Sequence, residues 1–247
     1  MITLRVEKLK KYFGGIKAVD DCSFEIESGS VVALIGPNGA GKSTVFNLIS
    51  GIIEADAGSI IFSDIDIVGL PPYKISNLGF SRIFQASSLF DNLTVEDNLF
   101  LAFDNEDTKF WKNLLGFNKP TQIKEKKVKE MLELVDMEKF RKNIARDLSF
   151  GQKRLIELAR AIINPHSILM LDEPVAGINP KLRERISKIL IKLKEEGETI
   201  LLIEHDMDFT LNIADRVIVM EKGTVIADGS PEQIKNNHKV LEAYLGE

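Results

Sequence analysis

Short apolar runs alternate with longer helical patterns along this chain of 247 residues. Four runs have the length of strands: SVVALIG (30–36), SILMLDE (167–173), TILLIEH (199–205) and RVIVMEKG (216–223). Three of them are nearly continuous in apolar residues, which is typical of parallel strands that are buried on both faces. The pattern therefore predicts strands at these four positions.

A helical pattern separates the second and third of these runs. Asn179 is expected to cap the helix, Pro180 to be its first residue and Gly197 to stop it. The apolar stripe of this helix consists of Leu182, Ile186, Ile189, Leu190 and Leu193. A strand, a helix and a strand at this spacing form a βαβ unit, so the predicted fold class is α/β.

The middle of the chain, 87–160, has helical patterns and no convincing strand. One helix is expected to start at Thr94 and Asp97, which are residues typical of a helix cap. A second helix is expected over 121–135, directly after a proline. The intervening residues 104–120 are polar with a small aromatic group, and we expect them to form a surface excursion.

Composition narrows the classes of function. Hydrophobic residues make up 44% and charged residues 28% of the chain, as in ordinary globular proteins. The net charge of −5 argues against non-specific nucleic-acid binding, which depends on clustered lysine and arginine. The single cysteine, Cys22, excludes an internal disulfide and a cysteine metal cluster. Signal-peptide and membrane-spanning patterns are absent, so we expect a soluble chain whose membrane role comes through a partner.

The segment GPNGAGKST (36–44) fits the pattern G-x-x-x-x-G-K-[ST] and lies between a predicted strand and a predicted helix. Its glycines let successive backbone N–H groups converge on phosphate oxygens. Lys42 supplies a positive charge for the β- and γ-phosphates, and Ser43 supplies a hydroxyl for Mg²⁺. The predicted phosphate-binding residues are Gly36, Pro37, Asn38, Gly39, Ala40, Gly41, Lys42, Ser43 and Thr44.

Polar side chains follow several of the predicted strands. Asp172 and Glu173 end ILMLDEP, and His205 ends the next strand in LLIEHD. Ligands of open α/β sheets bind beyond the carboxyl ends of the strands, so these side chains are expected near the ligand. Two adjacent carboxylates with different roles suit Mg²⁺ binding and water activation. Gln85 in FSRIFQ is placed similarly but is uninformative by itself.

The segment DLSFGQKRL (147–155) predicts a second anion-favouring feature. Ser149 can cap a helix, and Gln152 can reach back to complete a capping box. Such a helix start directs backbone N–H groups outward and favours an anion. Because the chain already has a predicted phosphate site at 36–44, we expect this helix start to have a role other than binding the same phosphates.

Together these motifs resemble the ATPase subunit of an ABC transporter. The P-loop, the Gln85 segment, LSFGQ, ILMLDEP and IEHD occur across essentially the whole chain. The resemblance implies a P-loop NTPase core with a parallel sheet flanked by helices, an N-terminal antiparallel β portion and an inserted helical lobe. It implies one domain over 1–247, with its nucleotide-binding core over 1–86 and 161–247 and a lobe over 87–160 that carries the signature motif.

The resemblance also implies the roles of the site residues. ATP is expected on the P-loop, with Phe13 stacked on adenine and Tyr12 as the alternative. Glu173 is expected to polarise the attacking water, and His205 to steady the γ-phosphate. Gln85 is expected to link the nucleotide site to the helical lobe. The implied catalytic residues are Glu173, His205, Lys42 and Gln85, and the implied Mg²⁺ ligands are Ser43, Gln85 and Asp172.

The resemblance also implies a role for the second anion-favouring feature, the helix start at Ser149. In the family, the residues that match Ser149, Gly151 and Gln152 close over the γ-phosphate that another copy of the fold holds. The chain has one P-loop and one signature segment, so the resemblance implies a second ATPase subunit, either an identical or a related chain. It further implies transmembrane permease subunits, an indirect solute-binding protein, no nucleic acid, and a peripheral place at the cytoplasmic face of the membrane.

Two departures from the commonest family pattern indicate which subfamily the chain resembles. Phe150 stands where the commonest signature has glycine, and AGINP replaces the frequent ALD form, so Asn179 is expected mostly as a helix cap. The segments AGINP, IEHDM, GSPEQI and LEAYLGE resemble one of the paired ATPases of branched-chain amino-acid importers. The lipopolysaccharide-export ATPase shares the AG turn and YLGE but usually keeps the glycine at position 150, and it remains the alternative.

Other classes of ABC protein fit the sequence less well than a transporter ATPase. A soluble ABC ATPase of DNA repair is expected to have a long coiled coil, and no heptad run occurs here. Translation-type members usually have two P-loops in one chain. A degenerate structural subunit would not need Lys42, Glu173 and His205 together. The sequence therefore favours an ATPase that powers a transporter, and it does not specify the cargo.

Overall fold

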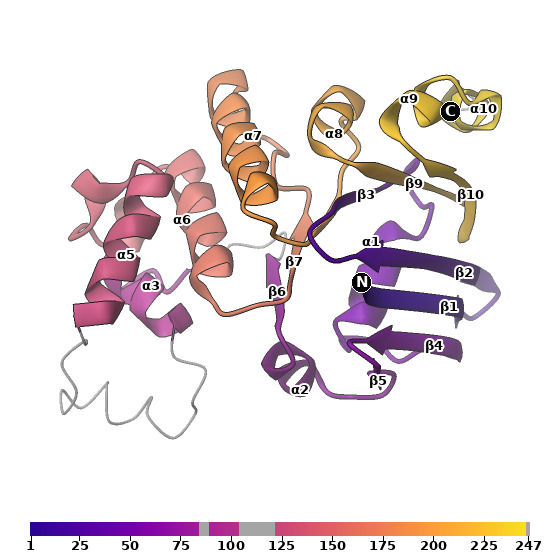
Figure 1. Cartoon of the computed structure of the whole chain (residues 1–247), viewed down its shortest axis with the longest axis horizontal. Coiled ribbons are helices and arrows are strands. Elements are labelled where there is room, and N and C mark those ends of the chain that lie inside the picture. Colours follow the sequence, from indigo (N-terminus) through magenta and orange to yellow (C-terminus); the bar gives the residue numbers. More distant parts are fainter. Residues whose placement is uncertain (84–88, 104–121, 246–247) are drawn as a thin grey trace. The chain divides into compact units, whose positions relative to one another are not determined.

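The computed structural model describes residues 1–83, 89–103 and 122–245, and its elements are labelled in Figure 1. Gln85 and the expected surface excursion 104–120 lie outside the described residues. Contacts divide the chain into two compact units. The first unit comprises Met1–Phe80, Ser167–Glu173 and Leu190–Glu247, and the second comprises Ser81–His166 and Pro174–Ile189.

An antiparallel sheet lies at the N-terminal end of the first unit. Its strand order is β2-β1-β4-β5. The strands are β1 (Ile2–Phe13), β2 (Ile16–Glu27), β4 (Ala57–Phe62) and β5 (Ile65–Asp66). Figure 1 shows β2, β1 and β4 side by side. The antiparallel β portion that the sequence predicted is confirmed.

The second sheet has the strand order β10-β9-β3-β8-β7-β6. Its strands are β3 (Val31–Ile35), β6 (Phe80–Ile83), β7 (Ile168–Asp172), β8 (Ile200–Ile203), β9 (Arg216–Glu221) and β10 (Thr224–Gly229). Strand β3 pairs in parallel with β8 and β9, and β7 pairs in parallel with β8. The four apolar runs therefore form β3, β7, β8 and β9 as predicted. Every residue of β3, β7 and β8 is buried, which explains their continuous hydrophobicity.

Five helices belong to the first unit in the part of the chain that the structure describes. They are α1 (Lys42–Ile49), α2 (Pro72–Asn77), α8 (Met207–Ile213), α9 (Pro231–Lys235) and α10 (His238–Leu245). Phe46 and Ile49 of α1 share one buried cluster with Leu4 of β1 and Ile203 of β8. Full burial of such a side chain contributes about 1.5–3 kcal/mol, so this cluster holds α1 and the loop before it firmly.

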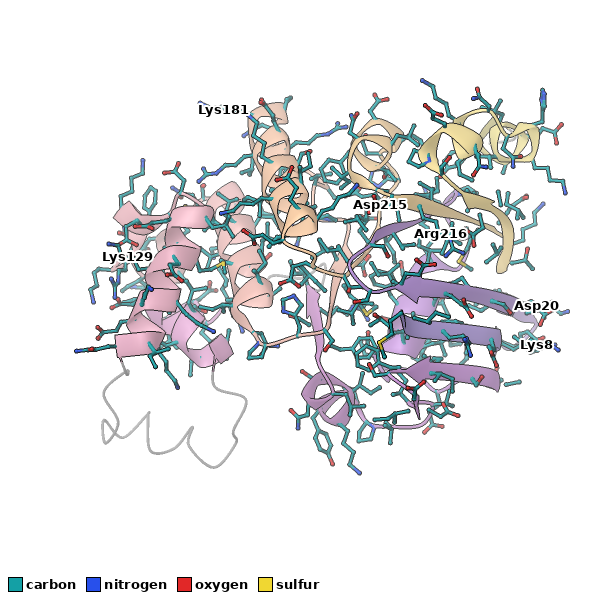
Figure 2. The ribbon with its side chains drawn as sticks, in the orientation of Figure 1. Lys8, Asp20, Lys129, Lys181, Asp215 and Arg216 are labelled. Carbon is teal, nitrogen blue, oxygen red and sulfur yellow. The ribbon has the colours of Figure 1, made fainter. Side chains whose placement is uncertain are left out.

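Polar contacts fix the strand that leads into that loop. Figure 2 shows Asp215 and Arg216 at the start of β9. Asp215 accepts a hydrogen bond from Val31 N–H at 3.0 Å and pairs with Lys194 Nζ at 2.6 Å. Arg216 binds both carboxylate oxygens of Asp228 at 2.6 Å, a bidentate pair with strict geometry. The contact of Asp215 with Val31 positions β3 beside the start of β9, and the Arg216–Asp228 pair joins β9 to β10.

Helix α7 (Pro180–Glu195) starts in the second unit and ends in the first. Its start is the predicted one, because Leu182 N–H donates to Asn179 Oδ1 at 2.9 Å. Gly197 has a positive φ of 85°, a conformation that suits glycine after a helix end. Ile186, Ile189, Leu190 and Leu193 of the predicted stripe are buried, and Leu182 is half-buried.

The second unit is helical in its described part. Helices α3 (Val95–Phe103), α5 (Gln122–Leu134) and α6 (Phe150–Ile163) contact one another, and the short 3₁₀ helices η1 (Glu138–Phe140) and η2 (Ala145–Asp147) lie between α5 and α6 in the chain. The expected lobe, 87–160, falls inside this unit. Its described residues contain no strand, only an isolated bridge between Thr94 and Ile144. None of the helices that the structure describes is long and apolar enough to cross a bilayer.

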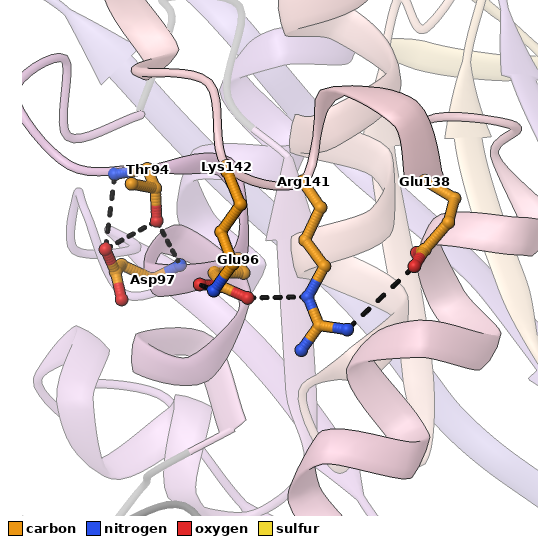
Figure 3. Close-up of polar contacts among 6 residues, drawn as sticks. All are labelled: Thr94, Glu96, Asp97, Glu138, Arg141 and Lys142. Atoms are coloured by element: carbon orange, nitrogen blue, oxygen red, sulfur yellow. Dashed lines mark hydrogen bonds and ion pairs between the residues drawn. The ribbon is translucent and has the colours of Figure 1, made fainter.

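Two sets of polar contacts hold the start of α3, one around Thr94 and the other around Glu96 (Figure 3). Asp97 N–H donates to Thr94 Oγ1 at 3.2 Å, which confirms the predicted cap. Glu96 is buried and accepts hydrogen bonds from Arg141 Nε, at 2.5 Å, and from Lys142 Nζ. Burial disfavours the charged carboxylate, but the hydrogen bonds from Lys142 and Arg141 outweigh it, so the pKa of Glu96 is lowered.

We predict that Glu96→Gln destabilises the protein by about 1–2 kcal/mol at neutral pH, because one partner of two charge-assisted hydrogen bonds becomes neutral. A lowered pKa in the folded state means that the stabilisation exists above the ordinary glutamate pKa and is lost as pH falls through the folded value. Urea unfolding at neutral pH and at about pH 3.5 measures the change. The difference between wild type and variant should shrink at the lower pH.

A matched control is Glu130→Gln on α5, which removes an exposed pair with Lys126 at 3.7 Å. Such a pair contributes only about 0.3–0.5 kcal/mol. An equal loss at both pH values in Glu96→Gln would contradict the assignment of the Glu96 charge as the stabilising group.

The single cysteine lies in the core of the first unit. Cys22 is fully buried, and desolvation raises the pKa of its thiol to about 12. Because the thiolate is the reactive form, the folded protein should resist alkylation by iodoacetamide near pH 8. Mass spectrometry should find the adduct only after unfolding in guanidinium. Rapid labelling of the folded chain would show that β2 opens readily.

Candidate active site

The loop 36–41 follows β3 and leads directly into α1. Two of its glycines are required by close packing against other parts of the backbone. A Cβ at Gly36 would lie 2.1 Å from Met220 O, and a Cβ at Gly41 would lie 2.3 Å from Ala18 O. Both residues also have a positive φ, 149° and 102°. No other residue type could follow this backbone path, so the loop has the conformation that the P-loop pattern predicts.

Lys42 is the first residue of α1 and is buried. Its Nζ donates to Gly36 O at 2.6 Å and to Pro37 O at 3.0 Å, so the ammonium lies within the curl of the loop. The start of α1 has no side-chain cap and no acidic residue in its first turn. The first backbone N–H groups of a helix have no partner within the helix, and together with a positive charge at the same helix start they form an anion site.

Two carboxylates lie at the carboxyl end of β7. Asp172 is buried as the last residue of the strand, and Glu173 is half-buried directly after it. Glu173 N–H donates to Ile203 O at 3.0 Å, which fixes it beside the end of β8. Glu173 has a positive φ of 48°, an uncommon conformation for a residue other than glycine, with a cost of about 1–3 kcal/mol. Strain of this kind is concentrated at functional sites.

His205 lies beside Glu173 in the first unit. The two come from the ends of neighbouring parallel strands, and His205 Nδ1 is 3.7 Å from Glu173 Oε1. The exposed imidazole and the half-buried carboxylate thus share one edge of the sheet. This is the edge at which the sequence placed them, beyond the carboxyl ends of the strands.

Glu204 is a further site residue that the sequence analysis did not identify. Its side chain is fully buried. Its Oε2 accepts a hydrogen bond from the backbone N–H of His205 at 3.3 Å and lies 3.9 Å from His205 Nδ1. The available signal was an acid directly after the apolar run of β8.

The two aromatic residues near the end of β1 differ in their surroundings. Tyr12 Oη donates to Asp20 Oδ1 at 2.7 Å, and this hydrogen bond raises the pKa of Tyr12. Phe13 is 48% exposed, with Lys11 Nζ 5.5 Å from its ring centroid. An exposed ring is available for stacking, so Phe13 remains the predicted adenine contact and Tyr12 the alternative.

The signature segment forms the start of α6 in the second unit. The predicted capping box is confirmed: Gln152 N–H donates to Ser149 Oγ at 3.3 Å, and Ser149 N–H donates to Gln152 Oε1 at 2.8 Å. A Cβ at Gly151 would lie 2.6 Å from Leu182 Cδ2, so a side chain there would require the Leu182 side chain to move. Phe150 is 65% exposed.

Ser149, Gly151 and Gln152 line a groove of about 540 Å³ within the second unit. Asn179 lines it as well, although its side chain already caps α7. Four basic residues contribute to the same groove, and one of them, Lys181, is labelled at the first turn of α7 in Figure 2. They are Lys139, Lys181, Arg185 and Lys188. Asp136 and Glu184 line the groove too and pair with Arg185 and Lys188, so its excess of positive charge comes from Lys139 and Lys181.

The oxygen donors fit a hard divalent cation. The exposed Ser43 hydroxyl and the Asp172 carboxylate are the oxygen types that Mg²⁺ prefers, and Mg²⁺ commonly takes its other ligands from water and phosphate. Among the described residues, no cluster of three or more histidine, cysteine, aspartate or glutamate side chains could hold a metal by itself. The donor set therefore suits an ion held chiefly by a bound nucleotide. Gln85, the third predicted ligand, lies outside the described residues.

The fold and the P-loop together define an ATP-binding cassette. The family described as ABC transporter matches residues 19–176, and a second family, described as branched-chain amino acid ATP-binding cassette transporter, matches residues 224–247. The chain belongs to the ABC transporter family and is an ATPase subunit that binds ATP.

Similar proteins place the chain more closely. It is 40% identical over 249 residues to the high-affinity branched-chain amino acid transport ATP-binding protein BraF of Pseudomonas aeruginosa, covering 99% of this chain and 98% of BraF. It is 39% identical to LivG of Escherichia coli K12, with the same coverage. A crystal structure of the ADP conformation of an ATP-binding cassette covers 100% of both chains with a TM-score of 0.86 and 35% identity. The predicted fold class and family are confirmed.

Proposed function

We propose that this chain hydrolyses ATP to drive the import of branched-chain amino acids through a membrane permease. The observation that carries the ATPase chemistry is the approach of His205 Nδ1 to Glu173 Oε1, at 3.7 Å, in the unit that bears the P-loop. The substrate class is supported by the relatives and by the family match over residues 224–247.

Each residue of this site has a separate role in phosphoryl transfer, a reaction that needs mainly positioning and charge stabilisation. The P-loop amides and Lys42 bind the phosphates, and Ser43 and Asp172 hold Mg²⁺, which supplies positive charge to the phosphate oxygens. Glu173 orients the attacking water and accepts its proton. His205 donates a hydrogen bond to the γ-phosphate, and the buried Glu204 carboxylate lies 3.9 Å from its Nδ1.

A complete site requires two chains. The P-loop lies in the first unit and the signature segment in the second, and the sequence has one of each. We propose that Ser149, Gly151 and Gln152 contact the γ-phosphate held by a second ATPase subunit, identical or related. The pair binds permease subunits at the cytoplasmic face of the membrane, and a solute-binding protein delivers the cargo to the permease.

Transport in proteoliposomes tests this proposal. The chain is co-purified from detergent-solubilised membranes with its permease subunits, which mass spectrometry identifies, and the complex is reconstituted with the solute-binding protein. Uptake of labelled leucine, isoleucine and valine should require ATP and should vanish with Glu173→Gln. ATP-driven uptake of lysine or glutamate in place of these three amino acids would contradict the substrate class. Absence of co-purifying membrane subunits would contradict the transport role.

A further inference from the structure

The backbone at Glu173 has two unusual features. The boundary between the two units falls on the peptide bond between Glu173 and Pro174. Glu173 has a φ of +48°, although a residue before proline prefers an extended conformation with negative φ. The proposed base therefore has a backbone conformation that the surrounding structure must maintain.

Hydrogen bonds hold this backbone from both sides. On the side of the first unit, Glu173 N–H donates to Ile203 O at 3.0 Å. On the side of the second unit, Arg154 Nε donates to Pro174 O at 3.1 Å, and both residues are buried. Arg154 lies on α6, five residues after the Ser149 cap. The helix that begins with the signature segment is thus bonded to the residue that follows the base.

Arg154 is itself held in place by a buried partner. Its Nη1 lies 3.3 Å from Glu157 Oε2, and the exposed fractions of the two side chains are 9% and 5%. The guanidinium is planar and rigid, so this ion pair fixes the direction in which Nε–H points. A buried ion pair generally adds little net stability compared with apolar residues of the same size. Stability alone therefore does not account for this charged pair.

The start of α6 also lies near the same loop. The ring of Phe150 lies 3.9 Å from the position that a Cβ on Gly177 would have. Phe150 and the AGINP segment, which contains Gly177, are the two departures from the commonest family pattern, and the fold places Phe150 near Gly177. The loop after Glu173 therefore contacts α6 through Arg154 and near Phe150.

We propose that Arg154 is a positioning residue for Glu173. Through its hydrogen bond to Pro174 O, Arg154 holds the strained turn that aims the Glu173 carboxylate. The inference rests on the proposed function, since it assumes that Glu173 acts as the base in ATP hydrolysis.

The sharpest test is the paired variant Arg154→Met/Glu157→Gln in the purified full-length chain. It removes the donor to Pro174 O together with the Glu157 carboxylate that would otherwise lose this partner. Because the Glu157 charge also acts on the half-buried Arg160, Glu157→Gln alone is measured beside it as the matched control. We expect kcat for ATP hydrolysis to fall about tenfold, the loss typical of one charge-assisted hydrogen bond. KM for ATP should stay within about twofold, because the P-loop contacts are unaltered. A change in KM with unaltered kcat would overturn the proposal.

A double-mutant cycle separates positioning from general damage. In a Glu173→Gln background there is no base to aim, so the paired variant should change the residual rate by less than about twofold. A tenfold loss in both backgrounds would show that the ion pair only supports the fold. The control Lys153→Met removes a neighbouring ion pair on α6, with Asp91 at 2.9 Å, and should leave kcat and KM unchanged.

A second variant covers the case in which the paired variant does not fold, as judged by circular dichroism. Arg154→Lys replaces Nε with a methylene and keeps the positive charge beside Glu157. Its kcat should fall at least about threefold at unchanged KM, and a wild-type kcat would overturn the proposal. Loss of ATPase activity in the wild-type chain itself would instead contradict the proposed function, so the two failures are distinguishable.

Discussion

Lys42→Ala lowers ATP turnover by about 10²–10³-fold, the cost of losing one preorganised contact to the transferring phosphate. The Lys42 ammonium points into the P-loop, where it donates to Gly36 O and Pro37 O. Its removal takes the positive charge from the phosphate site, so ATP binding should weaken as well. A steady-state phosphate-release assay and an ATP titration measure the two effects.

The fold should survive this change, because the side chain contacts the loop and contributes nothing to the apolar cluster of the first unit. Lys235→Ala on α9 is a control in the same unit, since it also removes one lysine charge but from an exposed position on another helix. Its ATPase activity should stay near that of the wild type. Near-normal turnover in Lys42→Ala would show that the P-loop assignment is wrong.

Glu173→Gln should stall hydrolysis and trap a dimer in the presence of ATP. The glutamine keeps the shape of the side chain but cannot accept a proton, and losing a general base costs about 10²–10⁴-fold in rate. In the wild type, hydrolysis removes the nucleotide bridge between two chains. At micromolar concentration the isolated wild-type chain should therefore be a monomer and a slow ATPase, because no permease supplies the effective concentration of order mM.

Size-exclusion chromatography with light scattering measures this outcome. The Glu173→Gln chain should be a dimer with ATP and a monomer with ADP. Adding Ser149→Arg should abolish the dimer, because a bulky side chain would occupy the phosphate approach at the start of α6. Persistence of the dimer in this double variant would show that the signature segment does not clamp the partner's nucleotide.

The chain offers a matched control for the loss of the cap. Ser230 and Gln233 form a second capping box at the start of α9, with the same hydrogen-bond distances of 2.8 and 3.3 Å. Ser230→Arg therefore removes an equivalent cap from a different helix. In the Glu173→Gln background this control should still dimerise with ATP.

The features that the sequence determined by itself depend on residues close together in the chain. The capping box of Ser149 and Gln152 and the Asn179 cap of α7 each join residues three apart. The P-loop binds phosphate largely with consecutive backbone N–H groups, so nine successive letters predict it. The buried strands are recognisable for a similar reason, because burial on both faces requires an unbroken apolar run.

Only the tertiary structure decided which distant residues meet. Glu173 and His205 become neighbours because β7 and β8 pair in parallel, and strand order results from packing of the whole sheet. The complete burial of Glu204 is likewise invisible in the sequence, where it is one acid after an apolar run. Arg154 and Pro174 are 20 residues apart, and their hydrogen bond exists because α6 packs against the loop that follows β7. Local hydrogen bonds and apolar periodicity depend on neighbouring residues, so the sequence predicts them. The contacts between distant residues depend on how helices and strands pack together, which the order of these elements in the chain does not specify.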